Sequence, residues 1–331
     1  MRIAQLANFY GAASGGLRTC LDELGRGYAA AGHERLLVTP GTRATERADG
    51  RIHHVQVEGR RLPGLDPYLV ITDIKAVQDL LDDWRPDVIE VSDKLTLLRL
   101  ADWARPRRVG TVLISHERLD AHLRPRVRGW FPLTRVADAV NSRLIDRFDA
   151  IVAASSFAAD EFTRLGATNV VRVPLGVDLD TFRPPRGTGG SGAIPPTVGW
   201  LGRMSKEKRP ELAVETLRVL VERGIAVRMV LVGDGPMRGA LERAAAGLPA
   251  TFAGHVGDRH QLAAALGRAD VALNVCPAET FGLSILEALA CGTPAVAPNV
   301  GAAPELFASG AGLATYLHPE AFASAITEVL G

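Results

Sequence analysis

Two glutamates in the last quarter of the chain, Glu279 and Glu287, stand in a pattern that suits ligand binding. They lie eight residues apart in the stretch "ETFGLSILEAL". Glu279 precedes a predicted helix, whose first backbone amides lack intrahelical partners and attract anions. Glu287 lies one turn into that helix among apolar residues, where a carboxylate needs a partner or a ligand. A carboxylate can accept hydrogen bonds from both hydroxyls of a ribose diol. The helix-start amides belong to Phe281, Gly282 and Leu283.

Two cations follow an earlier predicted strand in "GWLGRMSKEK". The strand ends at Gly202, Arg203 comes next, and Lys208 lies just before a helix. Cations at a strand end and a helix start are suited to binding a diphosphate. The alternative is a solvated basic loop, which is the interpretation we favour for Lys206 and Arg209.

Two stretches in the first half of the chain could also contact an anionic ligand. Gly15 and Gly16 in "NFYGAASGGLRT" follow a strand and open a helix, which suits phosphate but is also common in structural turns. His116 follows the strand in "VLISHERL", at the edge of a parallel sheet where ligands bind, although a lone histidine is more often structural. Asp93 in "EVSDK" ends a neighbouring strand and is a candidate contact for an acceptor.

Four further polar residues are expected to be structural. Asp178 and Asp180 form a DxD sequence of the kind that binds metals, but no third ligand stands nearby, so we predict no metal site. Asp234 lies in the turn "VGDGP" and His255 in a loop after "FAG". Neither is expected to take part in chemistry.

Strand-like and helix-like runs alternate along the whole chain, which is typical of parallel sheets covered by helices on both faces. The Pro- and Gly-rich stretch "RPPRGTGGSGAIPP" interrupts the alternation and reads as a linker. We therefore predict an α/β protein with two doubly wound, Rossmann-like domains, residues 1–183 and 197–331, joined by the linker 184–196. Ligands of such sheets bind beyond the carboxyl ends of the strands, so a cleft between the domains is the expected site.

The composition describes an ordinary globular protein. The chain has 331 residues, 47% hydrophobic and 23% charged, with a net charge of +1, so no global field attracts nucleic acid. Its three cysteines have no CxxC spacing, which argues against a disulfide framework and a zinc site. No apolar run is long enough to cross a bilayer, and "MRIAQLANFYG" does not resemble a signal peptide. We expect a cytoplasmic protein.

The motifs "GRMSKEK", "VGDGP" and "ETFGLSILEALACGTPAVA" together resemble those of retaining glycosyltransferase family 4, whose fold is GT-B. The Glu-x7-Glu spacing from Glu279 to Glu287 is that family's hallmark. "NFYGAASGGLRT" and "SHERLDAHL" further resemble actinobacterial GDP-mannose-dependent phosphatidylinositol mannosyltransferases. The resemblance implies transfer of a hexose, with GDP-mannose the best candidate donor, to an acceptor hydroxyl that a lipid or a small molecule carries.

The resemblance also implies a role for each candidate residue. Arg203 and Lys208 would neutralise the donor diphosphate, Glu287 would bind the ribose, and Glu279 would contact the donor sugar. The amides of Phe281, Gly282 and Leu283 would surround sugar hydroxyls and phosphate, His116 would lie near O6 of the sugar, and the Gly15–Gly16 loop would close over the phosphates. The family needs no metal and no cofactor besides the nucleotide-sugar co-substrate. Its members are usually longer, and many end in a helix that crosses back onto the N-terminal domain.

The sequence leaves three alternatives open. The donor could be a UDP-sugar used on a small acceptor, the enzyme could be a nucleotide-sugar epimerase, or the chain could be a non-catalytic module that binds nucleotide sugars. A Rossmann oxidoreductase is less favoured because GxGxxG with a downstream acid is missing. Peripheral contact with the anionic inner face of a membrane is a further hypothesis. It rests on the arginines around Trp130 and Phe131 in "RPRVRGWFPLTR".

Overall fold

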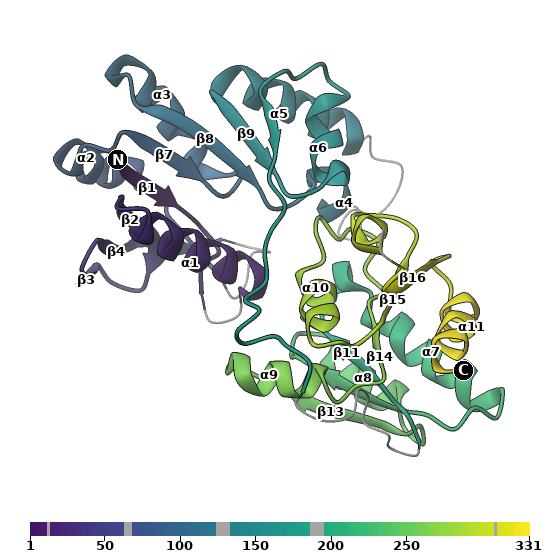
Figure 1. The fold of residues 1–331 in the computed structure, drawn as a ribbon. Coiled ribbons are helices and arrows are strands. Elements are labelled where there is room, and N and C mark those ends of the chain that lie inside the picture. Colours follow the sequence, from purple (N-terminus) through teal and green to yellow (C-terminus); the bar gives the residue numbers. More distant parts are fainter. Residues whose placement is uncertain (12–13, 63–67, 124–132, 186–194, 308–309) are drawn as a thin grey trace. The chain divides into compact units, whose positions relative to one another are not determined.

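A computed structural model describes residues 1–11, 14–62, 68–123, 133–185, 195–307 and 310–331 (Figure 1). The chain forms two compact units, an N-terminal unit built mainly from Met1–Pro174 and a C-terminal unit built mainly from Leu175–Gly331. Most of the predicted linker 184–196 lies outside the described residues, and so does 124–132, which holds most of the stretch predicted to contact a membrane. Both interpretations stay predictions.

An eight-stranded sheet forms the centre of the N-terminal unit, in the order β10-β9-β8-β7-β1-β2-β4-β3. Neighbouring strands are parallel except β3 and β4, which are antiparallel. The strands are β1 (Arg2–Leu6), β2 (Glu34–Gly41), β3 (Thr45–Asp49), β4 (Ile52–Glu58), β7 (Val88–Val91), β8 (Gly110–Ser115), β9 (Ala150–Ala153) and β10 (Val170–Arg172). A separate two-stranded sheet pairs β5 (Arg60–Arg61) with β6 (Leu69–Val70).

The chain order of these strands creates a switch point between β1 and β7. After β1 the chain builds the sheet outward through β2 and β4, and it then returns to the other side of β1 to add β7, β8, β9 and β10. Connections therefore leave β1 and β7 in opposite directions, which opens a crevice at their carboxyl ends. The segments that follow β1, β7 and β8 contain Gly15, Asp93 and His116, respectively.

Helices flank this sheet, and their apolar faces complete its core. They are α1 (Gly15–Ala30), α2 (Ile74–Trp84), α3 (Leu100–Ala104), α5 (Leu133–Arg147) and α6 (Ser156–Thr163), with 3-10 turns η1 (Thr96–Arg99) and η2 (Arg105–Arg107). Side-chain caps set two of the helix starts: Asp73 accepts from the amide of Ala76, and Ser155 accepts from that of Ala158. The buried core draws on five strands through Leu6, Val38, Val91, Leu113 and Ile151.

A six-stranded, fully parallel sheet forms the centre of the C-terminal unit, in the order β13-β12-β11-β14-β15-β16. The strands are β11 (Thr197–Leu201), β12 (Arg228–Val232), β13 (Ala250–Gly254), β14 (Val271–Leu273), β15 (Ala295–Pro298) and β16 (Gly312–Thr315). Its helices are α7 (Pro210–Glu222), α8 (Arg238–Ala244), α9 (Arg259–Leu266), α10 (Leu283–Ala290) and α11 (Pro319–Leu330), with 3-10 turns η4 (Lys206–Lys208) and η5 (Ala303–Phe307). The helix α4 (Leu119–Leu123) groups with this unit.

The switch point of this second sheet lies between β11 and β14. The loops that follow these two strands are far apart in sequence, yet they must leave the same edge of the sheet side by side. One of them carries Arg203 and Lys208, and the other carries Glu279. The predicted fold of two doubly wound units is confirmed.

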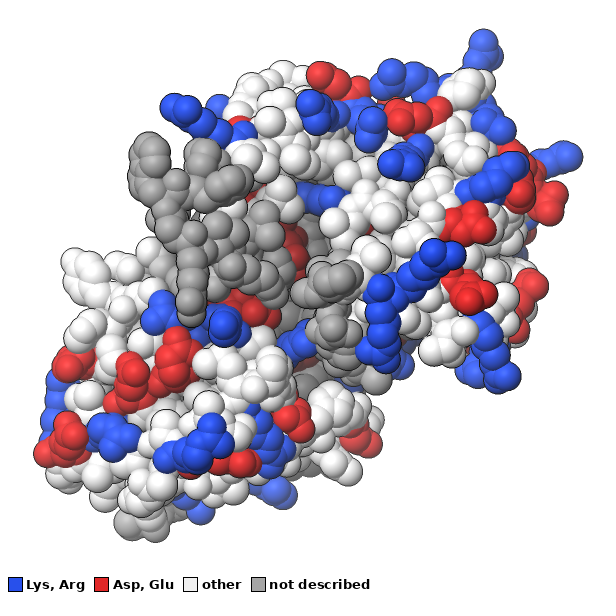
Figure 2. All heavy atoms as spheres, turned by 180° about the vertical axis from the view of Figure 1, so that it is seen from behind, with Lys and Arg blue, Asp and Glu red and all other residues white. Residues whose placement is uncertain are grey.

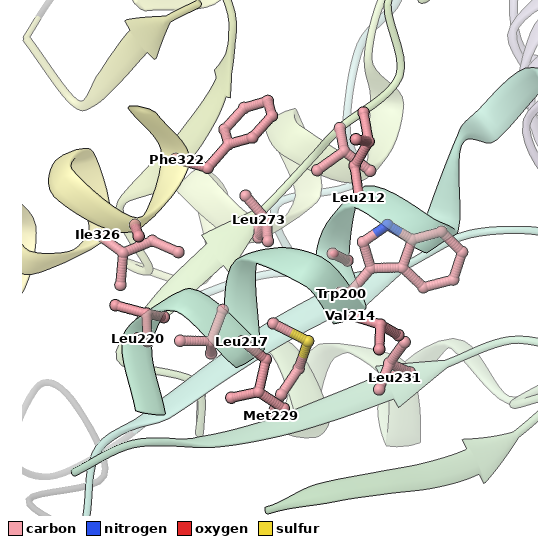
Figure 3. Close-up of a cluster of buried hydrophobic side chains, with 14 of the residues drawn as sticks. Trp200, Leu212, Val214, Leu217, Leu220, Met229, Leu231, Leu273, Phe322 and Ile326 are labelled. Carbon is pink, nitrogen blue, oxygen red and sulfur yellow. The ribbon is translucent and has the colours of Figure 1, made fainter. Parts of the chain in front are cut away.

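A dense apolar cluster holds the C-terminal sheet against α7 and α11 (Figure 3). Trp200 and Met229 come from adjacent strands, Leu217 from α7, and Phe322 and Ile326 from α11, and all are buried. Segment 175–183 also joins a C-terminal core, because Phe182 is fully buried there in a second cluster with residues of α9 and α10. Each unit thus has hydrophobic cores of its own.

The loop after β11 is supported by the turn after β12 through main-chain contacts. The amide of Met204 donates to the carbonyl of Asp234 at 2.9 Å, and that of Met237 donates back to the carbonyl of Met204 at 3.0 Å. Gly233 has φ +134°, and a Cβ on it would lie 1.9 Å from the carbonyl oxygen of Gly202. The motif "VGDGP" therefore forms the turn against which "GRMSKEK" packs, a contact that the sequence did not predict.

Charged side chains of both signs are interspersed over the face that Figure 2 shows, in keeping with the net charge of +1. Among the helices that the structure describes, none is both long and apolar enough to cross a membrane.

Candidate active site

Lys208 and Glu279 meet at the carboxyl edge of the C-terminal sheet. Lys208 Nζ donates to Glu279 Oε2 at 2.9 Å, although the two residues are far apart in the chain. Lys208 closes the 3-10 turn η4 after β11, and Glu279 lies in the loop between β14 and α10. The side chains are 34% and 13% exposed, respectively, so the pair can still be reached by a ligand. The sequence singled out both residues, and the structure brings them into direct contact.

Both partners of this pair are held in their charged forms. Burial alone would lower the pKa of Lys208, but nearby negative charges, chiefly that of Glu279, together with the hydrogen bond raise it. Burial would likewise raise the pKa of Glu279, but the charge of Lys208 and the hydrogen bonds to the carboxylate together lower it. An ammonium group thus stands ready to interact with an anion, and a carboxylate stands ready to accept from hydroxyls.

Asn274 is a site residue that the sequence analysis missed. It follows β14, and its side chain bridges the loop: Nδ2 donates to Glu279 Oε2 at 3.4 Å, and Oδ1 accepts from the amide of Cys276 at 2.8 Å. The residue is 9% exposed, so its rotamer is fixed by packing as well as by these bonds. Its position directly after a strand was the available signal, but "VALNV" reads as one continuous strand.

The start of α10 matches the expected anion site in part. Gly282 caps the helix with φ +95°, a conformation that favours glycine, and the helix begins at Leu283. The amide of Gly282 donates to Glu279, so it is not free in this structure, in contrast to the expectation from the sequence. Phe281 is 7% exposed, which restricts its contact with a ligand to the main chain. Leu283 lies in the first turn, where amides point out of the helix.

Glu287 is a buried carboxylate on the same helix. It is 7% exposed, and its carboxylate accepts no hydrogen bond within the described parts of the chain. Burial raises the pKa of Glu287 to about 7, with the charge of Arg259 opposing that rise. A group so placed gains from hydroxyls that a ligand brings, which fits the predicted role in binding a diol.

Arg203 stands at the start of the loop that ends in Lys208. It follows Gly202 directly after β11, and its carbonyl accepts from the amide of Ser205 at 2.9 Å. Met204 beside it is fully buried, which anchors this part of the loop. Arg203 and Lys208, the two residues predicted to bind the diphosphate, thus lie in the same loop after β11.

Gly15, Gly16 and His116 belong to the N-terminal unit. Helix α1 begins at Gly15, whose φ is +37°, and Gly16 lies in its first turn. His116 directly follows β8 and is partly buried, and burial lowers its pKa to about 4. Its imidazole is therefore neutral at pH 7 and can donate one hydrogen bond and accept one.

Asp93 holds the ends of β1 and β7 together. Its two carboxylate oxygens accept from the amides of Asn8, at 3.2 Å, and Leu95, at 2.9 Å. The residue is 6% exposed, and burial raises its pKa to about 6. These bonds give Asp93 a structural task at the strand ends, whatever contact it makes with an acceptor.

The DxD sequence is also engaged locally. Asp178 accepts from the amide of Asp180 at 3.0 Å and from the hydroxyl of Thr181 at 2.6 Å, which forms a turn. Within the described residues, no group of three or more His, Cys, Asp or Glu side chains is arranged to hold a metal ion.

Comparisons with known proteins identify the family of this chain. Residues 195–331 match the family model "Glycosyl transferases group 1", and residues 15–176 match "Glycosyl transferase 4-like domain". The chain is 43% identical over 340 aligned residues to a GDP-mannose-dependent alpha-(1-6)-phosphatidylinositol dimannoside mannosyltransferase of Mycobacterium tuberculosis, covering 100% of this chain and 88% of the relative. A GDP-mannose-dependent alpha-mannosyltransferase of Mycolicibacterium smegmatis is 29% identical over 288 residues, 84% of this chain and 74% of the relative.

Solved structures share the fold at low sequence identity. Sucrose-phosphate synthase of Thermosynechococcus elongatus aligns with a TM-score of 0.81 and 20% identity over 99% of this chain and 89% of that one. HepE of Anabaena, in complex with UDP and glucose, aligns with a TM-score of 0.74 and 20% identity over 100% and 90%. The predicted fold and family are confirmed: the chain belongs to the group 1 glycosyltransferases, has a glycosyltransferase 4-like N-terminal domain, and adopts the GT-B fold.

Proposed function

We propose that this glycosyltransferase moves mannose from GDP-mannose to a hydroxyl of a glycolipid, with retention of configuration and without a metal. The donor and the acceptor class are those in the name of the relative that is 43% identical over the whole chain. The observation that carries the proposal is the Lys208–Glu279 pair, together with the buried carboxylate of Glu287 on the helix that follows Glu279, which accepts no hydrogen bond within the described residues. Lys208 suits the diphosphate of the donor, Glu279 suits the sugar, and Glu287 suits the ribose.

Each part of the donor is assigned to residues of complementary charge or hydrogen-bonding capacity. Lys208, kept protonated by its surroundings, and Arg203 would face the diphosphate, which carries the negative charge of the donor. Glu287 would accept from the ribose hydroxyls. Glu279, held by Asn274, would accept from hydroxyls of the sugar, and His116 would exchange hydrogen bonds with the sugar as a neutral ring. The loop of Gly15 and Gly16 would cover the phosphates with main-chain amides.

The reaction needs the sugar to leave its phosphate. The bond between C1 and the phosphate oxygen breaks, the acceptor oxygen bonds to C1, and the proton of the acceptor passes to the departing phosphate. Because negative charge grows on the diphosphate, Lys208, Arg203 and the start of α10 act where stabilisation is worth most. Attack from the face that the phosphate leaves retains the configuration. The two cations on one loop support a mechanism in which side chains neutralise the diphosphate in place of a metal.

The test is a transfer assay with GDP-mannose and a phosphatidylinositol mannoside acceptor, run with and without EDTA. We expect a mannosylated product whose new linkage is α, formed equally well with the chelator. UDP-glucose and UDP-GlcNAc are offered in parallel, and nucleotide affinity is measured by calorimetry for GDP and UDP.

Each alternative has its own outcome in this assay. Tighter binding of UDP than of GDP, with transfer from a UDP-sugar, contradicts the choice of donor. A β-linked product contradicts retention, and loss of activity in EDTA that Mg²⁺ restores contradicts metal independence. Conversion of the donor to a C2 epimer indicates an epimerase, and tight donor binding with no product indicates a binding module.

A further inference from the structure

A buried ion pair lies directly behind the turn that carries His116. Lys94, in the segment after β7, pairs with Glu161 on α6. The two side chains are 7% and 0% exposed. The Lys94 ammonium also lies 4.7 Å from the ring centroid of Phe162, the neighbour of Glu161 on α6. Burying two charges costs several kcal/mol per ion before their attraction is counted, so stability alone is a weak reason for such a pair.

The ammonium group of Lys94 contacts the His116 turn in addition to the carboxylate of Glu161. Lys94 Nζ donates to the main-chain carbonyl of Glu117 at 3.0 Å. The hydroxyl of Ser115, on the other side of His116, lies 3.4 Å from the same carbonyl oxygen. A single point charge therefore joins the end of β7, the backbone next to His116 and the helix α6.

A second contact fixes the far side of the same turn to α6. Arg118 donates to the carbonyl of Phe157 at 3.1 Å and to Asp160 Oδ2 at 3.2 Å, and its guanidinium lies 4.7 Å from the centroid of the Phe157 ring. The residues before and after His116 are thus both held.

We propose that Lys94 and Glu161 are positioning residues, which set the place of the His116 ring through the carbonyl of Glu117. The proposal rests on the proposed function, in which His116 contacts the donor sugar. Glu161 fixes the direction of the ammonium, and the ammonium fixes the peptide that follows His116. A hydrophobic pair of the same volume would fill the space but would not hold a carbonyl oxygen.

The test removes both charges at once, so that neither is left buried alone. In Lys94→Met/Glu161→Leu we expect kcat for transfer to fall roughly 10- to 100-fold, because small misplacements of reacting groups cost about this much. The affinity for GDP should not change, since the side chains proposed to bind the nucleotide, Arg203, Lys208 and Glu287, lie in the other unit and the Gly15–Gly16 loop is left unaltered. Arg164→Met is the matched control: it removes the ion pair that joins Arg164, at the end of α6, to Asp138 on α5, and should change neither quantity.

A second readout does not depend on activity. The His116 ring is labelled with ¹³C and titrated by NMR, and its signal is assigned as the one missing from His116→Asn. Its pKa is about 4 in the wild type. In the double variant it should rise towards about 6.5, the ordinary value, because a turn that is no longer held exposes the ring. Arg164→Met should titrate like the wild type.

The outcomes separate this proposal from the proposed function. If the wild type transfers no mannose, the proposed function fails, and the titration alone decides whether the pair holds the ring. A folded double variant with wild-type kcat overturns the proposal, even if the His116 titration has moved. If the double variant does not fold, Glu161→Gln takes its place, since it keeps a hydrogen-bond acceptor for Lys94 at the same volume. For Glu161→Gln, kcat should lie between the wild-type value and full loss, and the pKa of His116 should lie between its wild-type and ordinary values. Wild-type values of both quantities overturn the proposal.

Discussion

Lys208 Nζ lies 2.9 Å from Glu279 Oε2. The residue expected to bind the diphosphate therefore forms an ion pair with the residue expected to contact the sugar. If the donor binds as proposed, its diphosphate competes with this carboxylate for the ammonium of Lys208. Donor binding would then rearrange or share the contact, so a change at either residue should affect the other.

Glu279→Gln should lower transfer and leave nucleotide binding intact or tighter. The amide keeps the shape of the side chain but releases the charge of Lys208, which then acts fully on the diphosphate. The lost contact with the sugar should instead reduce single-turnover transfer, because that contact strengthens in the transition state. GDP affinity and single-turnover rate are measured on the same preparation. The control is Glu215→Gln, the same change at an exposed position of α7. A marked loss of GDP affinity in Glu279→Gln would show that the carboxylate serves the nucleotide.

Glu287→Gln should weaken GDP-mannose and GDP alike, by about 1–3 kcal/mol, the cost of losing a charged hydrogen-bond acceptor. Ribose hydroxyls stabilise the ionised carboxylate, so binding should lower its pKa from about 7. Binding near pH 6.5 should then release protons in the wild type but not in the variant. Calorimetry in buffers of different ionisation enthalpy measures this release. Equal proton release in both proteins would assign it to another group.

The same residue should cost the folded protein stability at alkaline pH. The pKa of Glu287 rises from 4.5 to about 7 on folding, so the folded state binds its proton more tightly. Its favourable contribution is complete below pH 4.5 and is lost as the pH rises through 7. At pH 8, Glu287→Gln should therefore stabilise the C-terminal unit, by on the order of 2–3 kcal/mol. Urea denaturation at pH 5 and pH 8 checks the sign, and a larger gain at pH 5 would contradict it.

Asn274→Ala should reduce transfer with little effect on GDP affinity. The variant removes the bridge between Glu279 and the amide of Cys276, so the carboxylate is held by fewer groups. Asn274→Asp keeps the bond to Cys276 but sets a negative charge beside Glu279, and it should be worse than alanine. Steady-state kinetics should show the loss in kcat. If the aspartate variant matches the wild type, Asn274 does not orient Glu279.

Gly233→Ala should destabilise the C-terminal unit and disturb the Lys208 loop. A Cβ would lie 1.9 Å from the carbonyl oxygen of Gly202, and the residue has φ +134°. We expect the free energy of unfolding to fall by about 2 kcal/mol or more, together with weaker GDP binding. Gly224→Ala separates the two causes, since φ there is +73° with no atom near the new Cβ. Its cost should be roughly 1 kcal/mol, with GDP binding unchanged. Similar losses in both variants would show that the contact with Gly202 is not important.

The sequence predicted the elements and the strand ends, because both follow from local patterns. The alternation of apolar runs predicted two doubly wound units, and the helix in "ETFGLSILEAL" begins where expected, with Gly282 as its cap. The positions of Lys208 and Glu279 after their strands were also predicted. Their contact was not, because it depends on β11 and β14 being neighbours in the sheet, which no local pattern encodes.

Residues that hold other residues were harder to find. Lys94 and Glu161 are far apart in the chain, and each looks like a surface charge until α6 is packed against the strand ends. Asn274 was assigned to a strand that in fact ends one residue earlier, at Leu273. The amide of Gly282 was expected to be free because helix rules describe orphan donors without the loop side chains that can cap them.

The contact between the "VGDGP" turn and the loop before Lys208 is made by main-chain atoms. Amides and carbonyls are common to nearly all residue types, so this contact places little demand on the side chains that flank it. Side chains in this turn can therefore be substituted without moving Lys208. Gly233 and Gly235 are different, because a Cβ at Gly235 would also lie within 2.5 Å of a carbonyl oxygen, that of Met204. A library randomised over this turn should accordingly retain function with many residues everywhere except at these two glycines.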